Sequence, residues 1–273
     1  MGDILQLKQR LHNIHAVHEI TDAMQIIATI MIGQAQRFLD YRKKLQAYYD
    51  RIYLTQDIER AQLRKDKGEE WVIVFFSEKG FCGNFNPQLL PLLNQHKKIK
   101  NVIVMGNRGK VYAERLGLRQ AHFFSGAKRS PSEDLTEGAF NILKAHGFPH
   151  NVKVVFNKYN NMFQQVPRVV DFFPKQEDVF SGRGTLIDID EEYLAGTILE
   201  NYVKARLFFF ISQTFTGEIA SKLLMMQNAT DSAEKLQNEI SREVSKERQS
   251  RITQELSEVI SAYKVLQSQN ERR

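Results

Sequence analysis

The apolar positions in the first part of the chain recur at helical spacing. From Ile4 to Ile52 they are separated by roughly 3.4 residues on average, which is close to the repeat of a left-handed coiled coil and far from that of a strand. We therefore predict one helix from about residue 3 to residue 60, roughly 85 Å long. A helix of this length needs a packing partner, because propensity alone contributes little of its stability.

The end of the chain shows the same kind of pattern. Its apolar side chains fall at steps of three, four or their sums, at Ile240, Val244, Ile252, Leu256, Val259 and Leu266. No proline occurs beyond Asp190, so we predict a helix of roughly 75 residues, interrupted at most near Gly196 and Gly217, that spans about 110 Å. The two long helices bury their apolar stripes most completely as an antiparallel pair, with the C-terminal one extending further.

Between these helices the pattern changes to alternating strands and helices. The run 71–76 is apolar, β-branched and aromatic, as is typical of a fully buried strand. Further elements are predicted as helix 87–95, strand 102–105, helix 108–116, strand 120–124, helix 132–146 and strand 152–156. This alternation predicts an open, largely parallel sheet. Residues 156–173 predict an edge hairpin, because Pro167 cannot donate to a central ladder.

Two polar segments separate these parts. Residues 64–70 are charged apart from Gly68, and residues 175–189 are largely polar. The predicted fold class is α/β, in which N- and C-terminal helices form a long antiparallel coiled coil around a central Rossmann-like domain. We assign residues 1–64 and 190–273 to the coiled-coil shaft and residues 69–189 to the α/β domain.

Composition narrows the function classes. The chain has 273 residues, 42% of them apolar, a net charge of +6 and a pI near 9.2. Acids and bases are interspersed and no nucleic-acid-reading motif is present, so we predict solvated helix faces and no nucleic-acid partner. Cys82 is the only cysteine, which rules out an internal disulfide. We expect no targeting peptide and no spanning helix, because the longest apolar run falls far short of ~18 residues.

The sequence offers little that is typical of an active site. Neither the loop with Gly80 and Gly83 nor the loop with Gly106 and Gly109 has the spacing of a P-loop or a dinucleotide fingerprint. These glycines more simply serve strand-to-helix turns. The histidines His12, His15 and His18 drift around a helix and do not converge on one metal ion. We therefore predict no catalytic residue, no cofactor and no metal.

Two helical segments invite other roles. The aromatic run 208–210 predicts where the C-terminal helix docks on the α/β domain. Arg248 has no acid three or four residues away, which favours either an acidic partner outside the chain or a solvated side chain.

Several motifs resemble the gamma subunit of F-type ATP synthases. Residues 248–261 read Arg-Gln-x-x-Ile-Thr-Gln-Glu-Leu-x-Glu-Val-Ile-Ser, which is similar to the C-terminal signature of that family. The loop 77–86, Ser-x-x-Gly-x-Cys-Gly-x-x-Asn, is similar to another of its landmarks. Further similarity lies at residues 20–24, 157–167 and 229–233. The resemblance covers nearly the whole chain.

The resemblance implies a non-catalytic central rotor shaft, which couples ATP synthesis or hydrolysis to ion translocation by rotation. Its implied partners are the alpha and beta subunits of a catalytic hexamer, an epsilon-type subunit and a membrane rotor ring. The implied location is peripheral, at the cytoplasmic face of a bacterial cell membrane. The expected partner contacts are Glu19, Asp22, Met24, Arg248, Gln249, Thr253 and Glu255. We expect the polar tail 267–273 to be disordered.

One segment departs from the family pattern. Where gamma subunits typically carry Lys-Ile-Thr-Lys-Ala-Met and a further lysine, this chain has Glu19, Asp22 and Met31. The local charge is lower by roughly five units, in a segment that in the family faces acidic loops of the beta subunits. This predicts a divergent member whose beta subunit presents a less acidic or a basic loop.

Two other function classes stay open on sequence alone. One is a coiled-coil scaffold with a degenerate nucleotide-binding-like domain, and the other is an enzyme that uses the α/β domain. The missing motifs make the enzyme the least favoured of the three.

Overall fold

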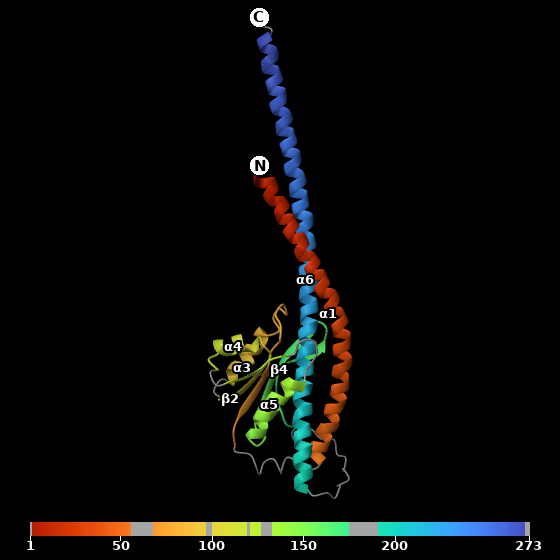
Figure 1. Ribbon diagram of the computed structural model, residues 1–273, viewed down its shortest axis with the longest axis vertical. Coiled ribbons are helices and arrows are strands. Elements are labelled where there is room, and N and C mark those ends of the chain that lie inside the picture. The colour runs from red at the N-terminus through yellow and green to blue at the C-terminus, as the bar shows by residue number, and fades with distance from the viewer. Residues whose placement is uncertain are drawn as a thin grey trace. The chain divides into compact units, whose positions relative to one another are not determined.

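The computed structural model describes residues 2–55, 68–96, 100–118, 121–126, 133–174 and 191–270 (Figure 1). The two long helices are α1 (Gly2–Thr55) and α6 (Glu191–Asn270), as predicted, and neither Gly196 nor Gly217 interrupts α6. The expectation of a disordered tail is wrong for residues 267–270, which continue the helix because nothing in their sequence breaks it. Residues 271–273 lie outside the described part.

A five-stranded sheet forms the centre of the α/β domain. Its strands are β1 (Trp71–Phe75), β2 (Asn101–Met105), β3 (His122–Phe124), β4 (Val152–Asn161) and β5 (Gln164–Asp171), in the order β3-β2-β1-β4-β5. The first four are mutually parallel, and β5 pairs antiparallel with β4. The predicted open, largely parallel sheet with an edge hairpin is confirmed. Pro167 lies on the edge strand β5, opposite Asn157.

Helices cover both faces of this sheet (Figure 1). The short helices η1 (Pro87–Leu89), α3 (Leu90–Gln95) and α4 (Gly109–Arg115) cover one face, and α5 (Glu133–Ala145) with part of α6 covers the other. Along β1 the side chains alternate between the two cores: Trp71, Ile73 and Phe75 face α5 and α6, whereas Val72 and Val74 face α3 and α4. A strand buried on both faces is apolar at every position, as the sequence showed.

The aromatic run 208–210 docks α6 on the sheet, as predicted. The Phe210 ring lies 5.6 Å from the Phe75 ring and 4.8 Å from the Phe156 ring, measured between centroids. Phe208 faces the other way, with its ring 5.6 Å from that of Phe38 on α1. The run therefore joins the sheet, α6 and α1 into one core.

A polar cluster fixes the same three elements to one another. The buried Tyr202 hydroxyl donates to a carboxylate oxygen of Asp50 at 3.0 Å, and Gln46 Nε2 donates to the same oxygen at 2.8 Å. Arg206 pairs with Asp50 at 3.4 Å and donates to the Phe172 carbonyl at 2.9 Å. Burial, above all, raises the pKa of Tyr202 well above its ordinary value. The tyrosine therefore stays a neutral donor at physiological pH.

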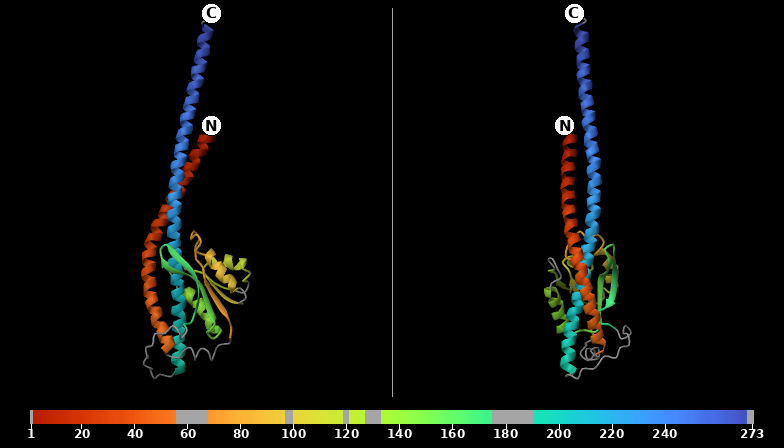
Figure 2. Two further views of the ribbon diagram at one scale, coloured as in Figure 1. Left: turned by 180° about the vertical axis from the view of Figure 1, so that it is seen from behind. Right: turned by 90° about the vertical axis from the view of Figure 1, so that its right-hand side faces the viewer.

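The chain divides into two compact units, residues 27–225 and residues 1–26 with 226–273. In the first unit α1 and α6 run side by side in both views of Figure 2 and are joined by a buried cluster, Ala28, Ile32, Ala35, Leu39, Ile219, Ala220 and Leu223. In the second unit, called here the terminal helical unit, the Thr230 hydroxyl donates to that of Thr21 at 3.0 Å. The pairing is antiparallel in each unit, as predicted.

The predicted domain boundaries lie in or beside residues 56–67 and 175–190, which are outside the described part, so they stay a prediction. The two compact units follow a different division, because each contains parts of both long helices. None of the described helices is long and apolar enough to cross a bilayer.

Candidate partner interface

The structure places two of the expected contacts of α1 in solvent. The Glu19 side chain is 67% exposed and lies 3.5 Å from the His15 ring, while Asp22 is also exposed. Met24 is half-buried. The acids that depart from the family pattern thus lie on the open side of the helix, where an ion pair with a neighbour one turn away contributes little.

The expected contacts of α6 are all exposed. Arg248 forms no ion pair or hydrogen bond within the described residues, in agreement with the lack of an acid at helical spacing. Glu255 lies 3.4 Å from Arg251, and the Thr253 hydroxyl donates to the Gln249 carbonyl at 3.0 Å. Arg248 and Gln249 therefore present unengaged side chains to an incoming surface.

An exposed apolar stripe runs between these polar residues. It consists of side chains that are 46–67% exposed, Ile252, Leu256, Val259, Ile260 and Tyr263. At about 100° per residue, these five positions fall within one side of the helix, with Arg248 and Glu255 along one margin, Thr253 along the other, and Gln249 within the same side one turn before Ile252. Contiguous apolar surface of this kind marks an interaction site.

The sequence pattern identified the stripe but not its exposure. Upstream, Ile240 is 5% exposed and Ala233 is 5% exposed, so the periodic positions there are buried. Ile4, near the start of α1, lines a shallow groove with residues 247–258 of α6. The groove residues of α6 continue the side of the helix that carries Ile240, whereas at about 100° per residue Ile252 and Leu256 lie roughly 120° and 160° around the helix from Ile240 and are exposed. The signal in the sequence was the eight-residue step from Val244 to Ile252, which moves the apolar positions to another side of the helix.

At the start of the first glycine loop, the backbone N–H groups of Ser77, Glu78 and Lys79 are hydrogen-bonded within the protein. Glu218 on α6 is 5% exposed, and its carboxylate accepts from the N–H of Glu78 at 2.8 Å and from that of Lys79 at 3.1 Å. Lys222 lies 3.1 Å from the same carboxylate. Ser77 N–H donates to Asn86 Oδ1 at 2.9 Å. These donors are therefore already occupied and not available to a phosphate.

Backbone N–H groups of the second glycine loop are also hydrogen-bonded within the protein. The N–H of Asn107 donates to the Glu78 carboxylate at 3.3 Å, as does that of Gly126 at 3.2 Å. The N–H groups of Gly106 and Gly109 donate to backbone carbonyls at 2.8 and 2.9 Å. This edge, at the carboxyl ends of parallel strands, is where open α/β sheets bind nucleotides. Here the Glu218 carboxylate holds the first loop on α6, and the Glu78 carboxylate holds the loops after β2 and β3 by hydrogen bonds.

Cys82 belongs to this loop as well. It is buried, and its sulfur lies 3.5 Å from the Ser77 hydroxyl. Burial is the main cause that raises the pKa of the Cys82 thiol above its ordinary value. The neutral thiol behaves as a small apolar side chain at physiological pH, not as a nucleophile.

The three N-terminal histidines do not converge. His12 and His15 are exposed, and His18 is half-buried. Within the described residues, no group of three or more histidine, cysteine, aspartate or glutamate side chains is placed to hold a metal ion.

We expect the purified chain alone to show no saturable ATP binding at micromolar concentration and no ATP hydrolysis. In the first loop the N–H groups of Glu78 and Lys79 are already bonded to Glu218, and in the second the N–H of Asn107 is bonded to Glu78 and those of Gly106 and Gly109 to backbone carbonyls. Isothermal titration calorimetry on folded protein measures this directly. Saturation with a dissociation constant in the micromolar range would contradict the prediction.

The matching family model and two relatives of this chain all belong to ATP synthases. A family model described as ATP synthase matches residues 3–266. The ATP synthase gamma chain of Clostridium botulinum (strain Kyoto / Type A2) is 26% identical over 270 residues, which cover 94% of this chain and 96% of the relative. That of Corynebacterium urealyticum is 26% identical and covers 95% and 96%.

Solved structures show the same fold. A chain of the Euglena gracilis mitochondrial ATP synthase (OSCP/F1/c-ring) superposes with a TM-score of 0.71 at 15% identity, covering 97% of this chain and 95% of that chain. A chain of the central stalk and c-ring of the Tetrahymena thermophila mitochondrial ATP synthase gives a TM-score of 0.60 at 16% identity, covering 77% and 99%.

Proposed function

The chain belongs to the gamma-subunit family of F-type ATP synthases, and from that premise we propose that its terminal helical unit carries the contacts to the surrounding catalytic subunits. As a gamma subunit it is the non-catalytic central stalk, which couples rotation to catalysis in the other subunits. Its partners are the alpha and beta subunits of the hexamer, an epsilon-type subunit and the membrane rotor ring. It is a peripheral subunit of the membrane complex.

The exposed apolar stripe of α6 is the observation that carries the proposal. Five large apolar side chains on one side of a helix are costly to leave in water, at roughly 25 cal/mol per Å² of apolar surface. An enclosing apolar ring removes this cost without fixing the helix at one angle, because hydrophobic contact is non-directional. Arg248 at the margin of the stripe and Gln249 one turn before Ile252 supply directional contacts, which an acidic or polar loop of a catalytic subunit can accept.

Contacts within residues 27–225 support a role in transmitting torque. Glu218 joins α6 to loop 77–86, Phe210 joins α6 to the sheet, and Asp50 joins α1 to α6. These contacts come from separate elements and are buried or half-buried, so a force on the α/β domain is passed to the helical pair and not lost in local bending. The predicted division into residues 1–64 with 190–273 and residues 69–189 remains part of this proposal.

The relatives of this chain include bacterial gamma chains. We place the complex at the cytoplasmic face of a bacterial cell membrane on that basis. The exposed Glu19 and Asp22 favour a catalytic subunit whose facing loop is less acidic than usual, or basic, since like charges across an interface can cost several kcal/mol. The chain would then serve a divergent ATPase with its own matched partners.

We expect the double variant Glu19→Lys/Asp22→Lys to assemble about tenfold more weakly with the cognate alpha and beta subunits at low salt. With alpha and beta subunits from a standard enzyme it should assemble more strongly than the unaltered chain. Both differences should shrink at about 0.5 M salt, because screening weakens exposed charge pairs. The measurement is the fraction of chain that co-elutes with the hexamer, together with its ATPase activity.

A matched control reverses two exposed acids of the other unit, Asp40→Lys and Glu114→Lys, for the same change in net charge. This control should leave the partner preference unchanged. Equal assembly of all variants with both partners, at every salt concentration, would refute the electrostatic part of the proposal. If the unaltered chain fails to co-elute with any hexamer, the placement of the contacts on the terminal helical unit is wrong.

A further inference from the structure

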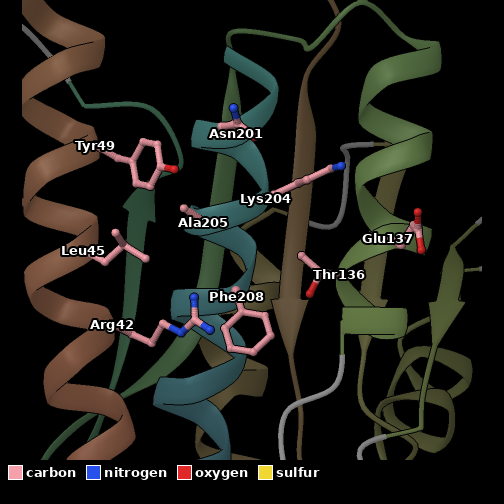
Figure 3. A pocket seen from close by; sticks show the side chains of 9 residues that line it. All are labelled: Arg42, Leu45, Tyr49, Thr136, Glu137, Asn201, Lys204, Ala205 and Phe208. Atoms are coloured by element: carbon pink, nitrogen blue, oxygen red, sulfur yellow. The ribbon is translucent and has the colours of Figure 1, made fainter. Parts of the chain in front are cut away.

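A groove of about 320 Å³ lies where α1, α5 and α6 meet within residues 27–225 (Figure 3). It is separate from the terminal helical unit and from both glycine loops. Its volume falls at the lower end of the range for small-molecule sites, roughly 300–1,000 Å³. The three helices contribute to it from distant parts of the chain, so a molecule bound here would touch all three.

One part of the groove is apolar. Leu45 and Tyr49 of α1 and Ala205 and Phe208 of α6 line it. Phe208 is 7% exposed, whereas the other three are half-buried. This surface suits an aromatic ring or a short acyl chain, which would lose its contact with water on binding.

Two cations line the same groove. The Lys204 ammonium extends from α6 toward α5 (Figure 3), is exposed, and forms no ion pair within the described residues. The Arg42 guanidinium lies 4.0 Å from the Phe208 ring centroid. Among the lining residues that the structure describes, Glu137 is the one acid, and the neighbouring Glu200 is paired with Lys144 at 2.8 Å. The described lining thus holds two cations and one acid, which favours an anion.

A buried hydroxyl adds a directional contact. Thr136 is 6% exposed, lines the groove, and its Oγ1 has no hydrogen-bond partner among the described residues. A buried polar group without a partner is costly, and an acceptor on a ligand removes that cost. Thr136 also lies in the first turn of α5, where the helix dipole attracts negative charge.

We propose that this groove binds a small organic anion, with its charged group near Lys204, Arg42 and the Thr136 hydroxyl and its apolar body against Tyr49 and Phe208. The ligand class is an aromatic or acyl carboxylate, sulfonate or phosphate. Because such a ligand bridges α1, α5 and α6, its binding raises the thermal stability of the chain by mass action. The site is independent of the catalytic-subunit contacts.

The test uses the full chain and two matched probes. One is 8-anilinonaphthalene-1-sulfonate, an aromatic anion, and the other is N-phenyl-1-naphthylamine, which has the same aromatic body without the charge. Fluorescence titration should give one saturable site for the anion, weakened about tenfold or more by Lys204→Met and several-fold by Thr136→Val. The neutral probe should bind the unaltered chain and Lys204→Met alike.

Two controls separate this site from other apolar surface. Lys110→Met removes an exposed charge on α4 and should change the affinity for the anion less than twofold. The double variant Leu256→Ser/Val259→Ser disrupts the exposed stripe and should leave the anion site intact. Equal affinity of the anion for the unaltered chain and Lys204→Met would overturn the proposal, as would loss of the saturable site in the stripe variant.

Discussion

Replacing Glu218 by alanine should lower the free energy of unfolding by about 3–5 kcal/mol, because it leaves Lys222 unpaired and two backbone N–H groups unbonded. The Glu218 and Lys222 side chains are 6% and 16% exposed, so water replaces the lost partner poorly. Urea unfolding followed by circular dichroism measures the change. The loop 77–86, which Glu218 holds on α6, should become accessible to proteolysis.

Three companion variants make this test specific. Glu218→Gln keeps an acceptor for the loop but loses the charge, and should fall between the unaltered chain and Glu218→Ala. The double variant Glu218→Gln/Lys222→Met removes the ion pair. Its loss in free energy of unfolding should be smaller than the sum of the losses in the single variants Glu218→Gln and Lys222→Met. Glu243→Ala alters an exposed acid on the same helix and should change stability by less than about 0.5 kcal/mol. A Glu218→Ala value as small as that control would contradict the assigned role.

The substitution Gly106→Ala should cost about 3 kcal/mol or more in the free energy of unfolding. Gly106 has a φ of +97°, and an added Cβ would lie 2.2 Å from the Phe76 carbonyl oxygen. The side chain therefore meets both backbone strain and a rigid backbone atom that cannot move aside. Thermal and urea unfolding of the full chain provide the measurement.

Variants at two other glycines separate the effect of the backbone conformation from the effect of the close contact. Gly117 has a φ of +72° with no atom within 4 Å of the added Cβ, so Gly117→Ala should cost only about 1–2 kcal/mol from the backbone conformation. Gly80 has open space and no left-handed φ, so Gly80→Ala should change stability little. Equal costs at the three positions would show that the close contact with Phe76 does not determine the role of Gly106.

Both predictions concern loops that resemble nucleotide-binding turns at first sight. Their glycine spacing argued against phosphate binding from the sequence alone. The structure adds the physical reason, which is that Glu218 and Glu78 already accept from the N–H groups in question. The α/β domain thus uses the geometry of a nucleotide-binding sheet as a rigid joint between the loops and α6.

The candidate interface could be predicted only in part. The lack of an acid near Arg248 in sequence implied an unpaired side chain, and the structure agrees within its described residues. The sequence did not separate Met24, which is half-buried, from the exposed Glu19 and Asp22. Burial at a single helical position depends on the neighbouring helix, about which local spacing says nothing.

The sequence by itself determined the elements and their pairing. Apolar periodicity specified two long helices, the apolar run 71–76 specified a strand buried on both faces, and Pro167 required an edge. These features follow from the local geometry of the backbone, which fixes where successive side chains point.

The tertiary structure decided which of these patterns are satisfied inside the chain. Ile240 is buried while Leu256 is exposed, because at about 100° per residue Leu256 lies roughly 160° around α6 from Ile240, away from the side that borders Ile4 of α1. Glu218 reads as one more helix acid, yet it accepts from loop residues about 140 positions away. Contacts between distant segments form only when the whole fold brings them together. The same local helical pattern can therefore form part of the core, hold a loop in place or remain exposed for a partner.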